Sequence, residues 1–92
     1  MNQPIRANDA RKLLRRILIN GVVTYSQPHA IDRLKERALS TLDCENVLRA
    51  GVVEEAEWND GGWRHQVRTQ RIVVVVEFLS EEEILVVTAW RL

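Results

Sequence analysis

The spacing of apolar residues changes near the middle of the chain, from a helical period to strand alternation. Before Gly51, apolar side chains recur at three- and four-residue steps, the spacing of one helix face. After Gly51, apolar and polar residues alternate, which is typical of strands with one buried face. The pattern predicts an α+β domain in which N-terminal helices pack on a twisted antiparallel sheet of four to five strands.

The first predicted helix begins at a cap on Asn8 or Asp9 and ends near Asn20, where Asn20-Gly21 supplies a stop. Its expected inward stripe is Leu13, Leu14, Ile17 and Leu18. Its expected outward face is basic and consists of Arg11, Lys12, Arg15 and Arg16. Residues 22–25 are then expected to form a short strand.

Two further helices are predicted before Gly51. The second spans about Pro28 to Ala38, with proline at the first helical position, where a missing N–H costs nothing. The third follows Ser40-x-x-Asp43, which resembles a capping box, and ends at Gly51 in a left-handed conformation. Its expected inward side chains are Leu42, Val47 and Leu48.

The second half of the chain predicts an antiparallel meander. Its expected strands are 52–58, 63–68, 71–79 and 84–91, and Asn59-Asp60-Gly61-Gly62 is a hairpin turn signal. Residues 72–76 are apolar at every position, as expected of a central strand buried on both faces. We therefore expect the first helix or another chain to cover the second face, which allows a homodimer through the sheet or the N-terminal helix.

Length and composition indicate one domain over residues 1–92, with residues 1–21 as a helix added to a core at 22–92. The lone Cys44 excludes an intrachain disulfide, and no apolar run approaches a membrane span. We expect a cytoplasmic protein. The net charge of zero hides an asymmetry, because residues 1–50 carry about +4 and residues 51–92 about −4.

A row of three side chains on the second predicted helix suggests chemistry. His29, Arg33 and Arg37 recur at four-residue steps, on roughly the opposite side from the inward stripe of Ile31 and Leu34. A titratable imidazole in line with two guanidiniums can hold an anion and move a proton. This pattern points to phosphodiester chemistry.

A family resemblance rests on three segments. They are Ser26…His29-Ala30-x-x-Arg33-x-x-Glu36-Arg37-x-x-Ser40, Val47-Leu48-x-x-Gly51-x-Val53 and Val86-Val87-Thr88-Ala89-Trp90-Arg91. Together they resemble small bacterial domains grouped with RelE-like and BrnT-like toxins, over about residues 23–92. The resemblance implies a RelE-like or barnase-like fold, metal-independent cleavage of messenger RNA, and inhibition by a cognate antitoxin protein. It also points to Thr88 and Arg91 beside the helical row.

Metal-free RNA cleavage requires a base, an acid and cations at the phosphate. His29 is the candidate base and His65 the candidate acid, while the candidate phosphate clamps are Arg33, Arg37 and Arg91. Candidate RNA-binding residues are Arg33, Arg37, Arg64, Arg68, Thr88 and Trp90. No metal or cofactor is expected, because His29, Cys44 and His65 lack ligand spacing and no glycine-rich phosphate loop is present.

Structural alternatives remain open for each of these residues. His29 can simply hydrogen-bond the helix end, and the phase of His65 with Trp63 and Val67 favours a packed imidazole. Arg33 and Arg37 can pair with carboxylates. In an ideal strand Thr88 and Trp90 project to the face opposite Arg91.

The leading hypothesis is therefore a toxin-like, metal-independent endoribonuclease with an antitoxin partner. The alternative is a non-catalytic module that uses the same fold to bind a protein or nucleic acid.

Overall fold

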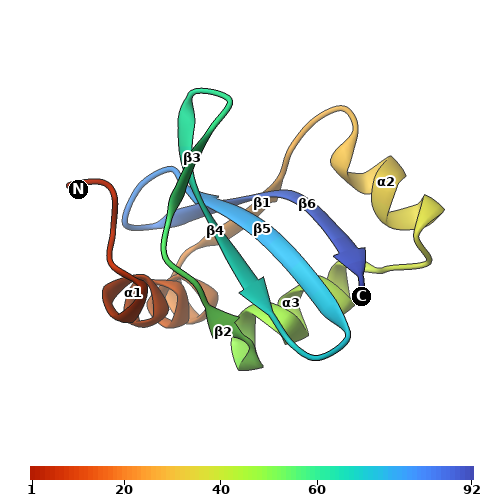
Figure 1. The fold of residues 1–92 in the computed structure, drawn as a ribbon, viewed down its shortest axis with the longest axis horizontal. Helices are drawn as coiled ribbons and strands as arrows, with labels where there is room; N and C mark the ends of the chain where they lie inside the picture. The colour runs from red at the N-terminus through yellow and green to blue at the C-terminus, as the bar shows by residue number, and fades with distance from the viewer.

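The computed structural model describes residues 1–92 and contains three helices and six strands (Figure 1). The elements in chain order are α1 (Ala7–Asn20), β1 (Val22–Tyr25), α2 (Ala30–Glu36), α3 (Thr41–Ala50), β2 (Val52–Val53), β3 (Glu57–Asn59), β4 (Gly62–Arg68), β5 (Ile72–Phe78) and β6 (Glu83–Arg91). The predicted α+β class is confirmed. No helix has both the length and the apolar character that crossing a bilayer requires.

The sheet is mixed and open, with the strand order β1-β6-β5-β4-β2, and β3 pairs with β4 as a hairpin. The meander from β4 to β6 is antiparallel, as predicted. The expectation of an entirely antiparallel sheet of four to five strands is wrong, because β1 pairs in parallel with β6 from Val22↔Glu83 to Tyr25↔Val86. That pairing joins segments about sixty residues apart, which no local pattern reveals.

Helices α1 and α3 cover the same face of the sheet, and α3 passes behind β4 and β5 in Figure 1. Leu14 and Ile17 of α1 and Leu48 of α3 belong to one cluster of 16 buried residues, together with inward side chains of the sheet such as Val74. The first helix therefore does not cover the second face, which we call the open face. Val73 is buried on that face but lies outside the cluster.

Three details of the first two helices differ from expectation. The N-cap of α1 is Arg6 and makes no side-chain cap, so Asn8 lies inside the first turn. Arg11 turns inward and donates to the carbonyls of Leu48 and Gly51, because the C-terminus of α3 offers unpaired acceptors and a negative dipole end. Helix α2 begins at Ala30, after a turn that contains the cis Gln27–Pro28 peptide, and ends at Glu36.

Helix α3 confirms its capping box, since Ser40 and Asp43 exchange side-chain and backbone hydrogen bonds at 3.1 and 2.8 Å. The inward assignment of Leu42 is wrong, because its side chain is 61% exposed. Gly51 has φ −77° and is not left-handed. Glycine is required there for close approach, since a Cβ would lie 2.7 Å from the Val47 carbonyl oxygen.

The single strand expected over residues 52–58 is interrupted. Strands β2 and β3 are separated by residues 54–56, and the Glu54 carbonyl oxygen lies 2.7 Å from His65 Nδ1. The hairpin that follows is as predicted, because Asp60 and Gly61 have φ values of 49° and 82°, which suit a tight two-residue turn.

The one-sided core predicts opposite outcomes for two leucines of α3. Leu48→Ala removes a fully buried side chain and is expected to lower the free energy of unfolding by about 2–5 kcal/mol. Leu42→Ala trims an exposed side chain and is expected to cost less than about 0.5 kcal/mol. Urea unfolding followed by circular dichroism compares them, and equal losses would contradict this packing.

Candidate functional site

The predicted helical row lies where α2 meets the C-terminal half of β6, and we call the surface of His29, Arg33, Arg37, Thr88 and Arg91 the α2–β6 corner. Strand β1 pairs with β6 only as far as Val86. The last residues of β6 therefore have no strand beside them on that edge, and α2 packs there, at the right of Figure 1.

Arg37 joins the helix to the strand. Its Nη1 donates to the Ala89 carbonyl oxygen at 2.7 Å and to Thr88 Oγ1 at 3.1 Å. The guanidinium thus satisfies a carbonyl beyond the end of β1, a common way of protecting a sheet edge. Arg37 forms no ion pair with a carboxylate, so the alternative of an Arg37–carboxylate pair does not hold.

Arg91 secures the same contact from the strand side. Its Nη2 donates to the Ala38 carbonyl oxygen at 2.6 Å, and its Nε donates to the Arg37 carbonyl oxygen at 3.2 Å. These acceptors follow the last turn of α2, where a cation also complements the helix dipole. Hydrogen bonds from the backbone and side chain of Ser40 lower the pKa of Asp43, and the charge of Arg91 lowers it further.

His29 and Arg33 are exposed and have no side-chain partner within the chain. His29 occupies the N-cap position of α2 without a side-chain cap hydrogen bond. Arg33 forms neither a salt bridge nor a side-chain hydrogen bond. The corner therefore presents one imidazole and one guanidinium to solvent, beside two guanidiniums that hold the helix in place.

The second predicted imidazole lies elsewhere. His65 is fully buried on the helix-covered face of the sheet, with its Nδ1 at the Glu54 carbonyl and its ring edge-on to Phe78 at 5.5 Å. Its Nε2 has no hydrogen-bond partner. The structure does not bring His65 together with His29. The surroundings of His65 fit the alternative of a packed imidazole.

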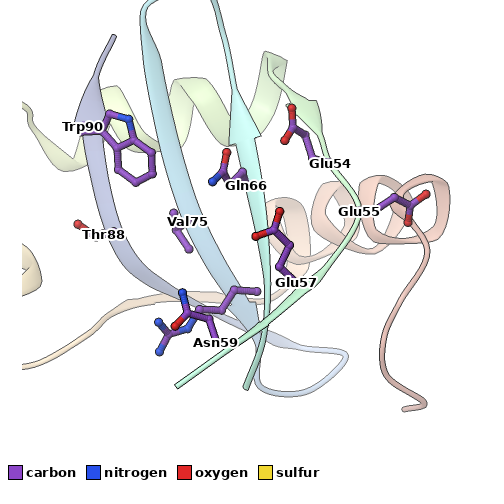
Figure 2. A pocket seen from close by; sticks show the side chains of 9 residues that line it. Glu54, Glu55, Glu57, Asn59, Gln66, Val75, Thr88 and Trp90 are labelled. Carbon is purple, nitrogen blue, oxygen red and sulfur yellow. The ribbon is translucent and has the colours of Figure 1, made fainter. Parts of the chain in front are cut away.

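Other predicted residues meet at a groove on the open face, which encloses about 180 Å³ (Figure 2). Thr88 and Trp90 of β6 and Arg64 of β4 are among its lining residues. Gln66, Val75 and Thr88 are paired directly across β4, β5 and β6 and form its floor. Thr88 thus belongs both to this open-face groove and to the α2–β6 corner, whereas no cavity is lined by His29, Arg33 or Arg37.

The groove carries carboxylates that the sequence patterns did not single out. Its remaining lining residues are Glu54, Glu55, Glu57 and Asn59. Arg68 is bound to Glu54 at 3.2 Å, and Arg64 lies 3.7 Å from both Asp60 and Glu77. The sequence does contain three glutamates within four residues before the hairpin turn. In a predicted strand such residues are ordinarily assigned to solvent-exposed positions, so they did not indicate a site.

The one thiol of the chain, Cys44, is buried and does not line the groove. Burial, with smaller effects from Asp43 and Glu45, raises the pKa of the Cys44 thiol to about 11, so the thiol is protonated at neutral pH. No group of three or more His, Cys, Asp or Glu side chains gathers to form a metal site.

Comparison with known families adds one finding. Residues 25–91 match the family model described as "Domain of unknown function (DUF4258)". The chain belongs to this DUF4258 family. The match covers α2, α3, both surfaces described above and nearly the whole sheet, and it leaves α1 outside. No curated protein and no solved structure matches the chain, and nothing ties the family to RelE-like or BrnT-like toxins.

The hydrogen bonds of the corner predict different roles for two arginines one turn apart. Arg37→Ala leaves the Ala89 carbonyl without its donor and is expected to lower the free energy of unfolding by about 1–2 kcal/mol. Arg33→Ala removes no contact and is expected to change it by less than about 0.5 kcal/mol. Chemical denaturation measures both, and a larger loss for Arg33→Ala would overturn this division.

Proposed function

We propose that this DUF4258 domain is a metal-independent endoribonuclease of the toxin type, with its active site at the α2–β6 corner and a cognate antitoxin as its inhibitor. The supporting observation is the Arg37 bridge to Thr88 and Ala89, because it fixes the row of His29 and Arg33 beside the end of β6. The RelE-like resemblance of the same residues is the second support.

In the proposed reaction, His29 takes the proton of the ribose 2′-hydroxyl. The 2′-oxygen then bonds to phosphorus as the bond to the 5′-oxygen breaks, giving a 2′,3′-cyclic phosphate and a 5′-hydroxyl end. Arg33 donates to the non-bridging oxygens, where charge accumulates in the transition state. Water supplies the proton of the leaving oxygen, since the buried His65 has no access to it.

Arg37 and Arg91 act in this proposal as positioning residues. Their donors are used by the carbonyls of Ala89, Arg37 and Ala38, so they hold α2 against β6. Their substitution is expected to lower activity together with stability, whereas substitution of His29 or Arg33 lowers activity alone.

The direct test is cleavage of a messenger RNA transcript by the purified chain in EDTA. We expect His29→Ala to lower the cleavage rate at least about 100-fold, the usual contribution of a general base, and Arg33→Ala to lower it at least about 10-fold. Lys35→Ala is the matched control, because it removes an exposed cation from the same helix, and should change the rate less than twofold. Equal cleavage by wild type and His29→Ala would remove His29 from the mechanism.

A non-catalytic binding module is the second candidate, and the burial of His65 favours it, because the corner then holds a single imidazole. The same experiment separates the two functions. A binding module would retain RNA in a gel-shift assay without cutting it, and its expression would not arrest growth of a bacterial host. An endoribonuclease would cut the RNA and arrest growth of the host, and His29→Ala would relieve the arrest.

A further inference from the structure

The open-face groove has features that RNA cleavage at the corner does not use. Its floor crosses three strands at Gln66, Val75 and Thr88, and the indole of Trp90 forms one side (Figure 2). Its opposite wall is the segment from Glu54 to Asn59, which leads into the hairpin. The result is a concave and mostly polar surface, in which Val75 and Trp90 are the only hydrophobic lining residues.

Several polar groups of the groove have no partner within the protein. Glu57 forms no salt bridge, and the side chains of Glu57, Asn59, Gln66 and Trp90 make no hydrogen bond. Glu54 Oε1 is bound to Arg68, and Glu55 turns toward α1, where it accepts from the Ala7 N–H at 2.9 Å. Figure 2 shows the Glu57 carboxylate directed over the floor and Glu55 directed away. Glu57 is therefore the carboxylate most available to a ligand.

The charge of the groove selects against nucleic acid. Three glutamates and one arginine line it, which leaves a formal charge of −2, and that arginine is already flanked by Asp60 and Glu77. A phosphate backbone would be repelled here. A cation is favoured, because it can pair with Glu57 while it contacts the indole face of Trp90.

The size of the groove selects against a complete small-molecule ligand. Its volume of about 180 Å³ is below the range of about 300–1,000 Å³ that holds drug-sized ligands and cofactors. Such a space suits one long side chain presented by another protein. A central charged anchor in a small pocket with an aromatic wall is also a common hot spot of protein interfaces.

We propose that the open-face groove binds a basic peptide segment of a partner protein, which inserts one arginine or lysine side chain between Glu57 and Trp90. The proposal does not rest on ribonuclease activity, because none of His29, Arg33 and Arg37 lines the groove. It gives the second face of the sheet a partner of defined charge, whichever function the corner performs.

The test is an NMR titration of the ¹⁵N-labelled chain with the peptide acetyl-Gly-Ser-Arg-Ser-Gly-amide. We expect the Trp90 indole N–H and the side-chain amides of Gln66 and Asn59 to shift, with a dissociation constant near 1 mM, about that of a single anchored side chain. The same peptide with neutral citrulline in place of arginine should bind at least about fivefold more weakly.

Matched variants place the interaction on the molecule. Glu57→Gln is isosteric at an exposed, unpartnered position, so it should leave the fold intact and weaken arginine-peptide binding at least about fivefold. Glu81→Gln removes an exposed carboxylate outside the groove and should leave binding unchanged. Equal binding by wild type and Glu57→Gln, or by the arginine and citrulline peptides, would overturn the proposal.

Other occupants give distinct results in the same spectra. Arginine amide that binds as tightly as the peptide would make the groove a small-cation site. An oligouridylate that shifts the same signals would assign it to RNA, and concentration-dependent shifts without peptide would assign it to a second copy of the chain. Each of these outcomes would overturn the proposal of a peptide segment from a partner protein.

Discussion

The burial of one sheet face by both long helices is the constraint on which the remaining structure depends. Helices α1 and α3 contribute to a single apolar cluster with the inward side chains of β4, β5 and β6. Because both helices are used on that face, the opposite face remains open, although β5 carries valine on both sides. Short α2 is left to cover the unpaired end of β6. The two candidate surfaces, one at the sheet edge and one on the open face, both follow from this arrangement.

The features that could be predicted from sequence have determinants within a few residues of one another. The capping box of Ser40 and Asp43 needs only a four-residue spacing, and the turn at Asp60-Gly61 needs only residues that accept positive φ. The alternation of β4 also placed His65 and Val67 on one buried face. Strand alternation also predicted that Thr88 and Arg91 project from opposite faces of the last strand. In the structure Thr88 lines the groove and Arg91 contacts the end of α2.

The features that could not be predicted depend on partners distant in the chain. The helical period predicts Arg11 on the outward face of α1. In the structure it donates to two carbonyls at the C-terminus of α3, about forty residues away in the chain. The sequence pattern predicts Arg37 as one member of a reactive row, whereas in the structure its guanidinium donates to the Ala89 carbonyl at the edge of β6. In the same way, the sequence does not predict that Glu57 lines the open-face groove, because this depends on the break between β2 and β3. The row on α2 was predicted, but its division into positioning and solvent-facing members was not.

The net charge of zero conceals two adjoining surfaces of opposite sign. The guanidiniums of Arg37 and Arg91 donate to carbonyls and a hydroxyl and form no salt bridge, although the charge of Arg91 also acts on Asp43. The carboxylates of the groove are only partly neutralised, because Arg68 holds Glu54 and Glu57 has no partner. Thr88 lies at the boundary of the two surfaces. Because a charged surface attracts ligands of the opposite sign, the corner favours an anion and the groove favours a cation. In the two functions proposed above, the ligand of the corner is an anion and the ligand of the groove is a cation.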